Sequence, residues 1–208
     1  MLKLQKLHVT RMEKLFIPVH AVTHTAKFYM QQVTKIMTVT ADAMNVLNIL
    51  SYEYDPCDFL KAQEFQQKRD IEGFKKSQAD DLINMQTGLF GYKGRVHFQP
   101  AACINEALAI LDRNMPKQEL FTTISALIDK GIHANYRIYP NNYVALDLLN
   151  GTTEYAANYT DEDKQTFLGY LDQQIARIQL PNKDVDFLRT KLLEMYANPL
   201  KNYLNAQA

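Results

Sequence analysis

Residues 19–54 read VHAVTHTAKFYMQQVTKIMTVTADAMNVLNILSYEY. Within this stretch, apolar or small residues recur at intervals that alternate between three and four positions. They are Val19, Val22, Ala26, Tyr29, Val33, Ile36, Thr40, Ala43, Leu47, Leu50 and Tyr54. Such spacing keeps one continuous seam on a single face of a helix. The sequence therefore predicts one long helix over about 19–54, and we expect the fold to be organised around it.

The weakest part of this helix is residues 33–40, where Val, Thr and Ile are dense. β-branched residues lower helix propensity modestly, so a kink or break near residues 38–40 is an alternative to a continuous helix. A β-strand is disfavoured there because the apolar residues do not alternate with period two.

Prolines and one capping residue divide the remaining chain into shorter helices. They are expected to follow Pro56, Pro100, Pro116, Thr160 and Pro181. The chain holds only 7 Gly and 7 Pro, too few for the turns of an all-β protein. The predicted fold class is all-α, a helical bundle built around the long helix with shorter antiparallel helices. An irregular α-solenoid-like array is the alternative, because the segments after Pro116 and Pro181 weakly resemble each other.

The length of 208 residues predicts a single domain over 1–208. Its best internal boundary is the loop 88–94, which carries Gly88, Gly91 and Gly94. A subdivision there gives a long-helix half at 1–87 and a short-helix half at 95–208.

Basic residues are concentrated at the start of a chain whose charge is balanced overall, with 23 Lys+Arg and 23 Asp+Glu. Residues 1–37 carry six Lys or Arg against one Glu, a net charge of +5. A basic segment of this kind binds nucleic acid or an anionic membrane surface in some proteins, and packs on an acidic remainder in others. The side chains that would make the contact with nucleic acid or lipid are Lys3, Lys6, Arg11 and Lys14.

Neither a signal peptide nor a run of about 18 apolar residues is found in the sequence. Cys57 and Cys103 lie 46 positions apart, and neither is part of a CxxC pair. Two reduced thiols in a cytoplasmic protein are therefore expected.

His20 and His24 are four residues apart, close enough on a helix to share a metal ion. A site would need another ligand, for which His8 and Glu13 are nearest. A solvated pair of histidines opposite the seam is the alternative. No cofactor is expected.

A second candidate site combines tyrosines with one arginine in the C-terminal half. Its residues are Tyr136, Arg137, Tyr139, Tyr143, Tyr155 and Tyr159. Tyrosine offers a large amphipathic contact area, so such clusters are common at recognition surfaces. The alternative is that each ring packs on its own helix end.

No catalytic residue is assigned, because no Ser-His-Asp or Cys-His arrangement can be placed by sequence. We expect a non-enzymatic protein–protein interaction or regulatory module that binds a protein partner or itself, as a homodimer through the spare length of the long helix. One alternative is a protein or enzyme that binds a small molecule or metal in a pocket between helices. Another is a nucleic-acid-binding regulator that uses the basic N-terminal segment.

Overall fold

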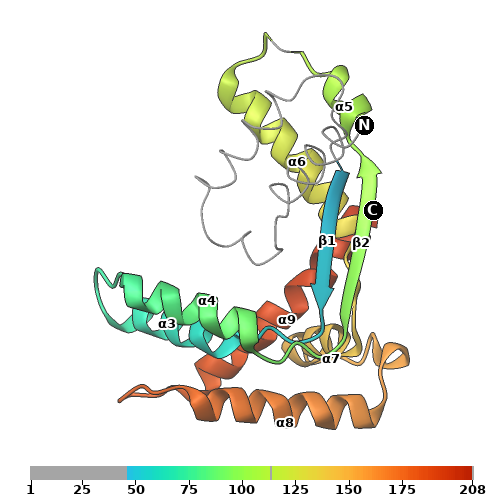
Figure 1. Ribbon diagram of the computed structural model, residues 1–208. Helices are drawn as coiled ribbons and strands as arrows, with labels where there is room; N and C mark the ends of the chain where they lie inside the picture. Colours follow the sequence, from blue (N-terminus) through green and yellow to red (C-terminus); the bar gives the residue numbers. More distant parts are fainter. Residues whose placement is uncertain (1–45, 113, 208) are drawn as a thin grey trace, which may run out of the picture. The chain divides into compact units, whose positions relative to one another are not determined.

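The computed structural model describes residues 46–112 and 114–207. This part of the chain is mostly helical, with seven α-helices and a two-stranded sheet, as Figure 1 shows. The elements in order are β1 (Val46–Tyr52), α3 (Asp58–Asp70), α4 (Gln78–Phe90), β2 (Val96–Cys103), α5 (Asn105–Ala109), α6 (Lys117–Asn135), α7 (Pro140–Asn150), the short 3-10 helix η2 (Ala156–Asn158), α8 (Asp161–Arg177) and α9 (Val185–Gln207). A mostly helical protein is thereby confirmed. The bundle arrangement and its solenoid alternative stay predictions.

The predicted helix over 19–54 is wrong at its C-terminal end, where Val46–Tyr52 forms the strand β1. Burial at this end has period two: Ile49 and Ser51 are buried, whereas Leu50 and Tyr52 are only partly covered. Pairing with β2 outweighs the helical spacing of the apolar residues, because strand preference depends on neighbours distant in sequence. The rest of the predicted helix, residues 19–45, lies outside the described residues.

The chain forms two compact units that are interleaved in sequence. Among the described residues, unit 1 comprises 46–51, 97–112, 114–136 and 206–207, and unit 2 comprises 52–96 and 137–205. This division does not coincide with the subdivision expected at 88–94. The expectation of a single domain over 1–208 stays a prediction.

In unit 1, an antiparallel strand pair accompanies helix α6. Figure 1 shows β1 and β2 running in opposite directions. Ile49 of β1 shares a buried apolar cluster with one face of α6, formed by Leu120, Phe121, Ile124, Ile128 and Ile132. Pro100 lies inside β2, so the helix expected to begin there is wrong in its start, and only the short α5 forms, from Asn105 onward. A proline is tolerated in a two-stranded sheet because its missing N–H can lie on the outer edge.

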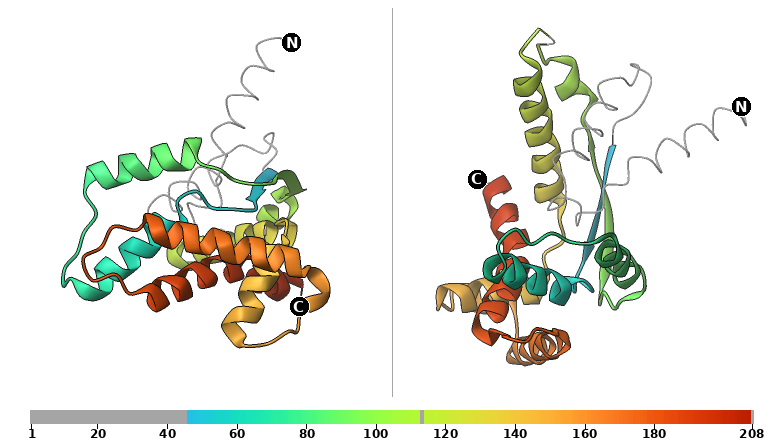
Figure 2. Two further views of the ribbon diagram at one scale, coloured as in Figure 1. Left: turned by 90° about the horizontal axis from the view of Figure 1, so that it is seen from below. Right: turned by 90° about the vertical axis from the view of Figure 1, so that its left-hand side faces the viewer.

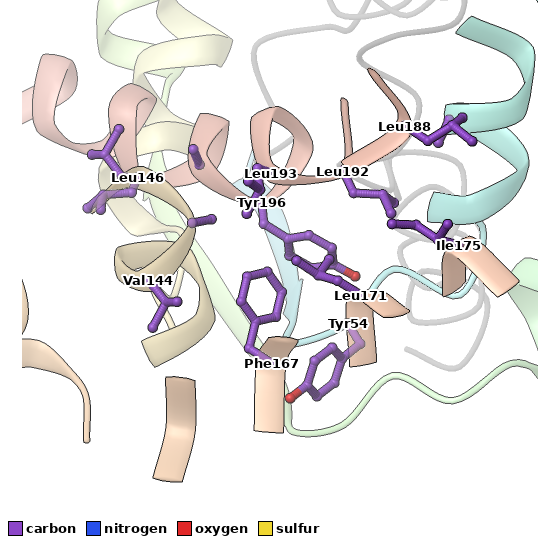
Figure 3. Packing of buried hydrophobic residues seen from close by; sticks show 14 of the residues in the cluster. Tyr54, Val144, Leu146, Phe167, Leu171, Ile175, Leu188, Leu192, Leu193 and Tyr196 are labelled. Atoms are coloured by element: carbon purple, nitrogen blue, oxygen red, sulfur yellow. The ribbon is translucent and has the colours of Figure 1, made fainter. Parts of the chain in front are cut away.

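In unit 2, helices α7, α8 and α9 supply most of a second apolar core. Figure 3 shows this cluster, in which the Phe167 ring meets the Tyr196 ring edge-on at a centroid distance of 5.1 Å. The predicted cap of α8 is confirmed: Thr160 Oγ1 accepts a hydrogen bond from the Asp163 N–H at 3.1 Å. Asp163 Oδ2 in turn accepts from the Thr160 N–H at 2.9 Å, completing a capping box.

Helix α4 differs from its neighbours because none of its residues is buried. Both views of Figure 2 place it at the edge of unit 2. A capping box at Ser77 and Asp80 starts the helix, and it runs through Gly88, so the expected glycine loop begins only at Gly91.

The two capping boxes predict different effects of removing the cap. Thr160→Ala should lower the free energy of unfolding of the protein by about 1 kcal/mol, because α8 is part of the core. Ser77→Ala should change that free energy by less than half as much and instead speed local opening of α4. Urea titrations followed by circular dichroism, with hydrogen exchange on α4, measure both effects. Equal losses of global stability would contradict the peripheral role of α4.

Candidate functional site

A buried carboxylate joins three helices of unit 2. Asp58, at the start of α3, is fully buried, and its Oδ2 accepts hydrogen bonds from the hydroxyl groups of Tyr170 in α8 and Tyr196 in α9, each at 2.7 Å. Asp58 Oδ1 accepts from the Phe59 N–H at 2.5 Å. Both carboxylate oxygens are therefore satisfied by neutral donors, as a buried charge requires.

Burial raises the pKa of Asp58 to about 7, against hydrogen bonds from Tyr170 and Tyr196 that lower it. Burial also raises the pKa of Tyr170 and of Tyr196, and the nearby Asp58 raises both further. Both tyrosines therefore keep their hydroxyl protons at neutral pH and remain hydrogen-bond donors.

Asp58, Tyr170 and Tyr196, which we call the Asp58 cluster, also fix the turn at residues 55–58. The Asp55 N–H donates to the Tyr196 hydroxyl at 3.0 Å, and Asp55 Oδ1 accepts from the Cys57 N–H at 2.9 Å. Lys61 pairs with Asp55 Oδ2 at 3.0 Å. The helix begins at Asp58 after this turn and not directly at Pro56.

Helix α4 packs on this turn through its smallest residues. The Cys57 thiol donates to the Asn84 carbonyl at 3.2 Å, and burial, which raises the pKa of this thiol to about 11, keeps it protonated. A Cβ on Gly88 would lie 3.3 Å from Cys57 Sγ, and a Cβ on Gly91 would overlap the Pro56 side chain. The close approach of α4 therefore requires glycine at position 91, whereas an alanine at position 88 would need only a small shift of the Cys57 side chain.

The opposite face of α4 is apolar and faces outward. Leu82, Met85 and Leu89 are 66%, 72% and 71% exposed, although they repeat at the spacing of a helix stripe that normally faces a core. Phe90, the last residue of the helix, is also exposed. We call Leu82, Met85, Leu89 and Phe90 the outward face of α4.

Charges at the two ends of α4 have opposite signs. Asp80 and Asp81 occupy its first turn, and Lys93 follows its C-terminus. The Lys93 ammonium group donates to the carbonyls of Leu89 and Gly91, at 3.2 and 3.0 Å. Each charge thus lies at the end that the helix dipole favours.

The tyrosines predicted to form a recognition surface are divided between the two units. Tyr136 packs against the cluster in unit 1, and the others belong to unit 2. Of these, Tyr139 is buried and Arg137 is exposed.

The remaining tyrosines of the set lie close to one another. The rings of Tyr143 and Tyr155 are 5.8 Å apart, and the Tyr159 hydroxyl donates to Asp147 Oδ2 at 2.9 Å. All three pack against the core of unit 2. Recognition by the predicted tyrosine set stays a prediction.

Sequence reasoning missed the Asp58 cluster and the orientation of α4. Asp58, Tyr170 and Tyr196 come from distant segments, and no local spacing connects them. The exposure of Leu82 and Met85 had no local signal either, because apolar spacing does not indicate whether a helix face is buried.

Among residues 46–112 and 114–207, no cluster of three His, Cys, Asp or Glu side chains is arranged to hold a metal ion. His20 and His24 lie outside the described residues, as do Lys3, Lys6, Arg11 and Lys14. Both cysteines are free thiols, Cys57 buried and Cys103 exposed. Within the same described ranges, no helix is long and apolar enough to span a lipid bilayer.

Comparison with known proteins yields no match, whether to a protein-family model, a curated protein or a solved structure.

The raised pKa of Asp58 predicts how stability depends on pH. The folded state binds the Asp58 proton more tightly than the unfolded chain, so this residue lowers stability as pH rises from about 4 towards 7. Asp58→Asn removes the titration and resembles the protonated acid. Relative to wild type, its free energy of unfolding should rise by about 2 kcal/mol between pH 5 and pH 8. Urea titrations at the two pH values measure this difference, and parallel pH profiles would contradict the assignment.

Gly88 and Gly91, where α4 and its C-cap approach Cys57 and Pro56, predict different effects of substitution on the stability of α4. Gly91→Ala should make the amides of α4 exchange about ten- to a hundredfold faster, because its Cβ would overlap Pro56 and overpacking costs about 1–3 kcal/mol. Gly88→Ala is the matched control. Its Cβ needs only a small shift of Cys57 Sγ, and alanine favours the helix, so exchange should change much less. Hydrogen exchange on α4 peptides measures both; an equal effect would show that Pro56 does not position the helix.

Proposed function

We propose that this chain is a non-enzymatic protein-binding module and that the outward face of α4 is its binding surface. The observation that supports this proposal is the reversed orientation of α4, which packs glycines inward and exposes Leu82, Met85 and Leu89. Contiguous exposed apolar surface on a globular protein is typical of an interaction site.

The composition and the rigidity of this face favour a protein partner. Methionine and aromatic side chains are enriched at the centre of protein interfaces, and the outward face carries Met85 and Phe90. The contacts of α4 with Pro56 and Cys57 hold it in place before binding, which lowers the entropic cost of association.

The Asp58 cluster supports a structural role and not a catalytic one. The carboxylate is fully buried, and both of its oxygens already accept hydrogen bonds from Tyr170, Tyr196 and the backbone. The metal, small-molecule and nucleic-acid hypotheses from the sequence remain separate predictions.

A photo-crosslinking amino acid at position 85 tests this proposal in the cells from which the gene comes. Position 173 on α8 is the matched control, because Gln173 is also exposed on a helix. We expect a protein adduct from position 85 and none from position 173, since only the former lies in an apolar surface. Adducts at neither position, or equally at both, would contradict a binding role for α4.

Fold integrity is checked with Met85→Glu. Because Met85 is exposed, this substitution should leave the melting temperature within about 2 °C of wild type. A large fall in melting temperature would mean that the rest of the chain covers Met85, and would refute the proposed surface.

A further inference from the structure

We infer that the partner on the outward face of α4 is a second copy of this chain, with the two α4 helices antiparallel about a two-fold axis near Met85. This inference rests on the proposed binding role of α4 and names its partner.

The apolar stripe is nearly symmetric about its centre. Leu82 and Leu89 are seven residues apart, which is two helical turns or about 10.5 Å, and Met85 lies between them. When a second α4 is turned by a two-fold rotation at Met85, Leu82 of each copy lies opposite Leu89 of the other, and the two Met85 side chains meet. A self-complementary patch of this kind is what an isologous dimer requires.

The charges select the antiparallel orientation. Asp81 lies in the first turn of α4, one turn before Met85, and Lys93 follows the other end of the helix. An antiparallel pair brings Asp81 of each copy towards Lys93 of the other. A parallel pair would instead bring like charges together. The helix dipoles favour the same arrangement, because each acidic N-terminus then lies beside the C-terminus of the other copy.

The chemistry of the face also favours a dimer over a charged partner. The only ionised side chains within α4 are Asp80 and Asp81, at one end, so its centre offers no charge to recognise. A second copy offers an equally uncharged surface, made of its own Leu82, Met85 and Leu89. The flexible Met85 side chains can adapt their shape where the two helices cross.

Sedimentation equilibrium of the purified full chain tests this inference. The wild type should have twice the 24.0 kDa chain mass at micromolar concentration. Met85→Glu should raise the dimer dissociation constant at least about tenfold, because two unpaired carboxylates would meet at the axis. Gln173→Glu, the same acid on an exposed position of α8, should leave the dissociation constant unchanged.

A charge exchange tests the orientation. Asp81→Lys and Lys93→Glu should each raise the dissociation constant about three- to tenfold at low salt, since each breaks two symmetric contacts. The double variant should return to within about twofold of wild type. Within one chain, Asp81 and Lys93 are twelve positions apart at opposite ends of α4, so their direct interaction is screened. Recovery in the double variant would therefore report a contact between copies.

Each failure points to a different error. A monomeric wild type, together with a position-85 adduct to another protein, would overturn the dimer and leave α4 as a binding surface. A monomer with no adduct would refute both proposals. A dimer unaffected by Met85→Glu, or single charge variants not rescued by the double variant, would overturn the antiparallel α4 interface.

Discussion

Unit 2 depends on a carboxylate that is buried without a cation. Asp58 accepts hydrogen bonds from the hydroxyl groups of Tyr170 in α8 and Tyr196 in α9. The Tyr196 hydroxyl also accepts from the Asp55 N–H and so holds the turn at residues 55–58, on which α4 packs. A charge in this position is costly unless every acceptor is satisfied, so the geometry of three helices is constrained at one point. Apolar packing alone tolerates sliding between helices more readily than this directional contact does. The position of α4 is thus decided within the core, although α4 itself buries nothing there.

The two faces of α4 therefore differ: small residues contact the rest of unit 2, and large apolar residues face outward. Contact with Pro56 and Cys57 is made by residues too small to cover an apolar surface, so the larger side chains remain on the outside. Burying Leu82 and Met85 against unit 2 would require the helix to rotate about its axis and bring bulky residues where only glycine fits. The close approach of the backbones and the exposure of the apolar face are therefore two aspects of one arrangement.

Local signals in the sequence predicted local structure well. Thr160 identified the start of α8, and Pro116 and Pro181 marked turns ahead of α6 and α9. Features decided by distant partners were not predictable in this way. The last residues of the supposed long helix form β1 because they pair with β2, some fifty positions later. The apolar residues of α4 have the spacing of a core-facing stripe, but spacing does not indicate whether a stripe faces a core or solvent. The Asp58 cluster had no sequence signal, because its members are brought together only by folding.

The interleaving of the two units affects the order in which the chain can acquire structure. Asp58 and Tyr196 are separated by 138 positions, and unit 1 takes up residues 97–136 of the intervening chain. When residues 52–96 leave the ribosome, the hydroxyl groups that satisfy Asp58 have not yet been synthesised. Unit 2 therefore completes its core only after α9 has emerged, which makes its closure an event of high contact order. During synthesis, the side chains of α3 that pack on α8 and α9 stay exposed until those helices have been made.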